Sequence, residues 1–198
     1  MGEREEKDLV SEAKDYVVHS IRGVGDVAGA IVDATSGAQI RALKGTRATG
    51  SELRALVVDT VTGTLHGVAQ VGGEVDSAAS SIMVGTLRGA RKVGKMGIEA
   101  VSGTAAALVM GAAEVGGDVG RTARNAVEGA IRVAQDVGMT AELAASAAAS
   151  GAMIGAGEIS EAALDQVRRV VTSTISGIKV VITEPFHSDG QQGTQYPV

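Results

Sequence analysis

The sequence predicts an all-α protein built on one very long helix that is rich in glycine and alanine. Three observations predict this fold class. Whole phases of an 11-residue repeat carry no charge, the repeat keeps its phase along most of the chain, and both prolines, Pro185 and Pro197, lie beyond it. Because proline disrupts a helix interior, a repeat without proline favours an uninterrupted helix.

An offset of 44 residues aligns three segments without a gap, at 17–50, 61–94 and 105–138, and a weaker fourth at 149–182. Since 44 is four times 11, the underlying unit is a hendecad. Three of its phases hold no charged residue anywhere between Leu9 and Val181. Eleven residues make about three helical turns, so these phases share one face and the charged phases share the opposite face.

This pattern divides the chain into three segments. Residues 1–8 form a charged N-terminal segment, 9–182 form the hendecad helix, and 183–198 form a polar, non-helical tail. The charged N-terminus is not followed by the apolar stretch of a signal peptide. We therefore expect a protein that is cytoplasmic or peripheral to a membrane.

Glycine makes such a helix weak on its own. Each interior glycine costs about 1 kcal/mol relative to alanine, and 25 of the 28 glycines lie between Leu9 and Ile182. One phase places glycine every 22 residues, a stripe that lets another backbone approach closely. The predicted helix-packing residues are Gly23, Gly45, Gly67, Gly89, Gly111, Gly155, Gly177, Val27, Val71, Val115 and Ile159.

The weak helix therefore needs neighbours, which predicts a parallel or antiparallel assembly of helices in a bundle, tube or filament. The pairs Gly72-Gly73 and Gly116-Gly117 could instead fold the chain into a hairpin. The unbroken phase favours the continuous helix over this alternative.

The sequence predicts no catalytic, cofactor or metal site, and so no enzyme. There are no cysteines, and His19, His66 and His187 are widely dispersed. The glycines from Gly23 to Gly29 have one residue too many for a dinucleotide fingerprint. Interspersed charges, a net charge of −5 and only three aromatic residues give no sign of nucleic-acid binding.

The segment Leu65-His66-Gly67-Val68-Ala69-Gln70-Val71-Gly72-Gly73 resembles the repeat region of synucleins. The repeat class is more loosely similar to perilipins and some late-embryogenesis proteins. This resemblance implies a helix that forms on a phospholipid or lipid-droplet surface. The first prediction is a structural protein that assembles with itself as a homo-oligomer. The alternatives are an amphipathic coat on lipid, a granule or a vesicle, and an oligomeric membrane channel.

Overall fold

The computed structural model describes residues 2–21, 26–44 and 51–182. In these ranges the chain forms eight α-helices, one 3-10 turn and a small antiparallel hairpin. Their bounds are α1 Gly2–Ile21, α2 Val27–Leu43, α3 Ser51–Gln70, α4 Val75–Lys92, α5 Ile98–Glu114, α6 Val119–Val133, η1 Gln135–Val137, α7 Ala141–Ile159, α8 Glu161–Val171, β1 Thr174–Ile175 and β2 Ile178–Lys179.

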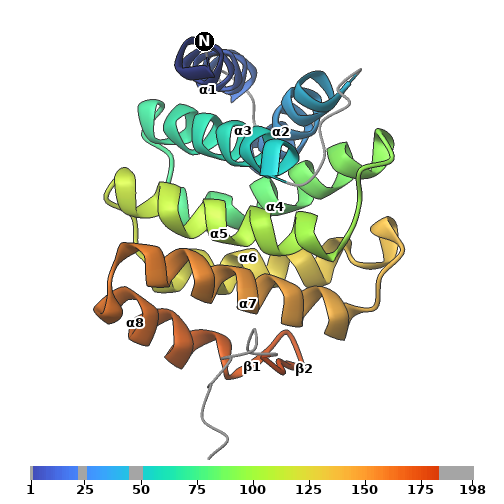
Figure 1. Cartoon of the computed structure of the whole chain (residues 1–198), viewed down its shortest axis with the longest axis vertical. Coiled ribbons are helices and arrows are strands. Elements are labelled where there is room, and N and C mark those ends of the chain that lie inside the picture. Colours follow the sequence, from blue (N-terminus) through green and yellow to red (C-terminus); the bar gives the residue numbers. More distant parts are fainter. Residues whose placement is uncertain (1, 22–25, 45–50, 183–198) are drawn as a thin grey trace, which may run out of the picture.

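The helices stack in two layers (Figure 1). Helices α1, α3, α5 and α7 form one layer, and α2, α4, α6 and α8 form the other. Each of α1 to α7 packs most extensively against a helix two places away in the chain, and less against its sequence neighbours. Consecutive helices therefore form hairpins that pile up along the long axis, which is the architecture of an α-solenoid.

Glycines in the left-handed conformation end the helices at a spacing of 22 residues. After α3, Gly72 has φ of 74°, its amide donates to the Ala69 carbonyl, and the Gly73 amide donates to the Val68 carbonyl. This pair of bonds is the Schellman motif, which needs a residue that tolerates positive φ. The same pair of bonds recurs at Gly94, Gly116 and Gly138.

The prediction of one very long helix over 9–182 is wrong. Helix plus turn occupies 22 residues, or two hendecads, so the phase resumes unchanged in the next helix. The 44-residue unit is therefore a helical hairpin, as the ends of α3 at Gln70 and α5 at Glu114 illustrate. Residues 2–8 of the charged N-terminal segment belong to α1, which begins at Gly2. The predicted tail, 183–198, lies outside the described residues.

The core between the layers is made mostly of alanine and valine. Its largest fully buried side chains include Leu65, Ile82, Met83, Leu87 and Leu108. The charge-free phase that begins at Ala13 is buried at nearly every described position. Faces that the sequence leaves apolar are thus covered by other helices of the same chain.

The two ends of the stack differ in structure. At the first end, the Arg41 guanidinium lies 4.1 Å from the Tyr16 ring centre and its Nε donates to Glu12 Oε1 at 3.3 Å. At the other end, β1 and β2 pair antiparallel beyond α6 and α7. Their turn, Ser176-Gly177, has positive φ at both residues, as a two-residue hairpin turn requires.

Candidate functional site

Glycines set the distance between helices of the same layer. We call the packing of a helix against the helix two places earlier a crossing. A Cβ added at Gly155 of α7 would lie 2.6 Å from the Ala106 carbonyl oxygen of α5. Gly151 lies even closer to the Ser102 carbonyl oxygen. A real Cβ could not occupy either position, so the backbones touch only because these residues have no side chain.

Three more crossings bring a glycine against backbone in the same way. On α4, a Cβ added at Gly85 would lie 2.6 Å from the Val32 carbonyl oxygen of α2. On α6, one added at Gly129 would lie 2.6 Å from the Ser80 carbonyl oxygen of α4. On α3, Gly63 meets the carbonyl oxygen of Val10 in α1.

The crossing of α5 over α3 is different. The atom nearest to a Cβ added at Gly111 is the end of the Leu65 side chain, and the closest backbone atom, the Thr62 Cα, is 3.9 Å away. One turn before the middle of α5, a Cβ at Gly103 would meet only the Arg54 Cγ, at 3.9 Å. Five crossings of the described residues have a glycine on the later helix, and among these only the crossing of α5 over α3 is held open by side chains. In the crossing of α8 over α6, where α8 itself has no glycine, Gly120 of α6 meets the Gln166 side chain.

A row of positions 22 residues apart marks the open crossing in the sequence. Glycine occupies positions 63, 85, 129 and 151, and each of these glycines touches backbone across its crossing. The member of the row on α5 is Ala107, which is fully buried. A methyl group at this position fits the wider separation of α3 and α5. The glycines predicted to pack, at positions 45, 67, 89 and 111, belong to a row four residues further along the chain, which does not contain this alanine.

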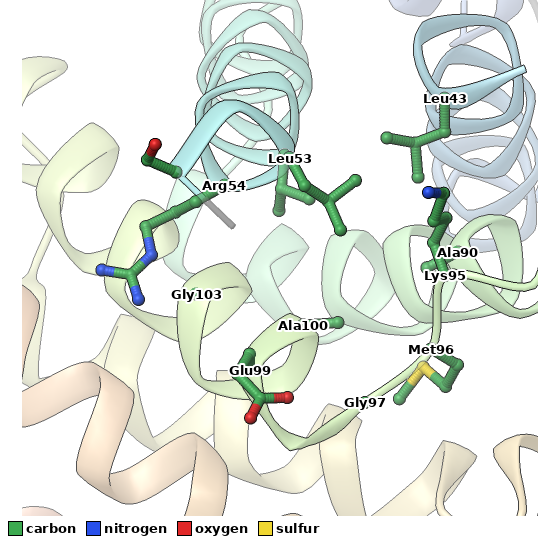
Figure 2. A pocket seen from close by; sticks show the side chains of 12 residues that line it. Leu43, Leu53, Arg54, Ala90, Lys95, Met96, Gly97, Glu99, Ala100 and Gly103 are labelled. Atoms are coloured by element: carbon green, nitrogen blue, oxygen red, sulfur yellow. The ribbon is translucent and has the colours of Figure 1, made fainter. Parts of the chain in front are cut away.

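A hollow of about 630 Å³ lies where α3 and α5 separate. We call it the α3–α5 hollow, and it extends back to the C-terminal ends of α2 and α4 (Figure 2). Its volume falls within the range of small-molecule sites, roughly 300–1,000 Å³. Its lining residues are Leu43, Ser51, Leu53, Arg54, Val57, Ala90, Lys95, Met96, Gly97, Glu99, Ala100 and Gly103.

Figure 2 shows how the side chains of the hollow lie. Leu53 and Ala100 stand between Arg54 on one side and Lys95 on the other. A second depression of about 500 Å³ runs over the outer face of α3, α5 and α7 and shares Ser51, Arg54, Glu99 and Gly103 with the hollow. We call it the outer groove. The two spaces therefore adjoin at these four residues.

Basic residues are concentrated in the described stretches next to the hollow. Residues 41–44, 51–54 and 88–99 together hold seven of the 18 lysines and arginines, and two of the 23 acidic residues, Glu52 and Glu99. Ion pairs to other helices join Arg41 to Glu12 and Arg88 to Asp136. These stretches are therefore positive in a chain whose net charge is −5.

The predicted packing residues fall into distinct environments. Gly67, Gly89 and Gly155 lie at crossings within this chain, against Lys14, Ser36 and Ala106 respectively, and Gly111 lies at the open crossing. Gly177 lies in the turn between β1 and β2. Gly23 and Gly45 lie outside the described residues.

The four predicted apolar packing residues lie at helix ends. Val27, the first residue of α2, and Ile159, the last of α7, are exposed. Val71 and Val115 directly follow α3 and α5 and are partly buried. They therefore pack around turns and not along the middle of a long helix.

No family model, curated protein or solved structure matches this chain. Within the described ranges, no group of three or more histidine, cysteine, aspartate or glutamate side chains is arranged to hold a metal ion. In the same ranges, no helix combines the length and the apolar character needed to cross a membrane.

Proposed function

We propose that this chain is a non-catalytic binding protein that holds a small amphiphilic molecule in the α3–α5 hollow. The observation that carries the proposal is the open crossing of α5 over α3, with its hollow, in a stack where the four other crossings that have a glycine on the later helix are closed by backbone contact. A regular repeat gives a rigid frame, and a local departure from it creates a concave site.

The lining supports binding in preference to catalysis. Most of its side chains are apolar, and Leu43, Val57 and Ala90 are buried. The ionisable residues of the lining are Arg54, Lys95 and Glu99. An apolar space with a few polar groups at its edge is the usual composition of a small-molecule site.

Self-assembly and the lipid-coat alternative stay predictions. Their main support in the sequence is an apolar, glycine-rich face that needs a neighbour. Gly67, Gly89 and Gly155 meet their neighbours inside the chain. The cost of the glycines therefore no longer requires a second copy or a lipid surface.

The test is binding of the neutral dye Nile red, whose fluorescence rises in apolar surroundings, to Gly103→Leu and a matched control. Gly103 lines both the hollow and the outer groove, and only the Arg54 Cγ lies within 4 Å of the added Cβ, so the new leucine takes up space where the two adjoin. Gly157→Leu is the control, because it is also a helical glycine, has nothing within 4 Å and lines neither space.

We expect the wild type and Gly157→Leu to bind the dye alike, and Gly103→Leu to bind at least about tenfold more weakly, or about 1.4 kcal/mol. Both variants gain helix propensity, so a difference in dye binding between them reports on the space that Gly103 lines and not on helix stability. Equal binding by all three proteins, or no binding by the wild type, contradicts the proposed function.

A further inference from the structure

We infer that the ligand of the α3–α5 hollow is an anionic amphiphile, a single alkyl chain that ends in a carboxylate or phosphate group. The inference rests on the proposed function and adds the charge and shape of the ligand. Two independent observations carry it: the apolar surface inside the hollow and the excess of basic residues at its border.

The apolar surface accounts for the tail. Leu43, Leu53, Val57 and Met96 come from three different parts of the chain and line one continuous space with Ala100. An alkyl chain placed there leaves water, and each buried methylene strengthens the binding. The hollow is not closed to solvent, so the head group can stay at its edge.

The charges at the edge favour a negative head group. Lys95 and Arg54 line the hollow from opposite sides, and Arg91 and Lys92 precede Lys95 at the exposed end of α4. A charge-assisted bond to a carboxylate or phosphate is stronger than one to a neutral group. A cationic head group would face repulsion from these side chains.

The acidic groups nearby do not reverse this preference. Glu99 is the one acidic residue in the described lining of the hollow, against the two basic residues Arg54 and Lys95. Asp59 and Glu158 line the outer groove and not the hollow, and Arg54 lies where the two spaces meet. Glu52 is exposed on the first turn of α3 and does not line the hollow.

The experiment is displacement of Nile red from the full-length protein by four ten-carbon amphiphiles below their micelle concentrations. Decanoate and decyl phosphate are the anionic arms and separate a carboxylate source from a phosphate source. Decanol and decyltrimethylammonium are the neutral and cationic arms.

We expect at least one anion to displace the dye at about tenfold lower concentration than decanol, with decyltrimethylammonium the weakest. Lys95→Met should bring the displacing concentrations of the anion and of decanol close together, and Lys95→Arg should keep them apart. Arg124→Met is the control, because Arg124 pairs with Glu128 on α6, and neither residue lines the hollow. The preference should fall as salt is added.

Equal displacement by all four amphiphiles, or preference for the cation, overturns this inference while the dye binding leaves the proposed function standing. An anion preference that Lys95→Met leaves unchanged also overturns it, since the head group would then lie elsewhere. If the dye does not bind the wild type, the proposed function fails first and the inference fails with it.

Discussion

The α5–α7 and α3–α5 crossings use helices of the same layer and of similar length, yet one is closed and the other is open. Gly151 and Gly155 bring the backbone of α7 onto that of α5, whereas Gly111 of α5 meets the end of the Leu65 side chain of α3. The α3–α5 crossing has the hollow and the α5–α7 crossing has a close backbone contact. The open crossing coincides with Ala107, the one alanine in a row that has glycine at positions 63, 85, 129 and 151.

The largest effect expected from this comparison is the loss of stability in Gly151→Leu. Its Cβ would overlap the Ser102 carbonyl, and backbone cannot move aside as a flexible side chain can. We expect the free energy of unfolding to fall by about 3 kcal/mol or more, as for severe overpacking. Urea denaturation followed by circular dichroism measures it.

Gly157→Leu is the control for this variant, since it lies on the same helix in open space. Its stability should equal or exceed that of the wild type, because leucine is the better helix former. Equal stability of Gly151→Leu and Gly157→Leu would show that α5 and α7 do not touch through Gly151.

Substitution of the αL glycine should destabilise the protein equally in the turn after α3 and in the turn after α5. The open and closed crossings would then differ because of their helices and not because of these turns. Gly72 and Gly116 have φ of 74° and 76°, and a Cβ added at either meets nothing within 4 Å. Gly72→Ala and Gly116→Ala should each lower the free energy of unfolding by about 1–2 kcal/mol, from backbone strain alone.

Asparagine at the same positions should restore part of this loss, because it tolerates the left-handed region better than alanine. Thermal and urea unfolding of the four variants give the comparison. If Gly116→Ala lowers the free energy of unfolding several times more than Gly72→Ala does, the two turns differ in themselves. The difference between the open and closed crossings could then not be assigned to the helices.

The smallest expected effect is a gain in stability. Gly103→Ala adds a methyl group at the open crossing, where the nearest atom is the Arg54 Cγ at 3.9 Å. Removing an interior helical glycine should therefore raise the free energy of unfolding by about 0.5–1 kcal/mol. Gly155→Ala, at the closed crossing, should lower it. Two changes of the same sign would contradict the contrast between the crossings.

The sequence predicts the helical class and the buried faces because both depend on local periodicity. It does not separate the two kinds of glycine. Gly67 and Gly72 lie five residues apart, and each belongs to its own 22-residue row, yet one packs inside a helix and the other ends it. The αL conformation of Gly72 is a property of the folded backbone. The position of a glycine in the hendecad repeat does not predict this conformation.

The candidate site was harder to foresee than the fold. Its walls come from Leu43, Leu53, Ala90 and Met96, which no local motif links. One sequence signal was available, namely Ala107 in a row where positions 63, 85, 129 and 151 are glycine. This alanine can be interpreted only once the structure shows that the glycines of its row contact the backbone of a neighbouring helix.

The central claim is that the repeat folds back every 22 residues, and a distance between His66 and Glu114 tests it most directly. The His66 Nε2 and Glu114 Oε2 atoms lie 3.8 Å apart, on α3 and α5. The chain has no cysteine, so His66→Cys with Glu114→Cys places two nitroxide labels without background. Dilution with unlabelled protein keeps the measured distance within one chain.

Pulsed electron spin resonance should give a label separation of about 20 Å or less, within two helix diameters. A continuous helix would place the two labels about 72 Å apart, from 48 residues at 1.5 Å each. A distance near the longer value would contradict the folded stack, and with it the hollow between α3 and α5.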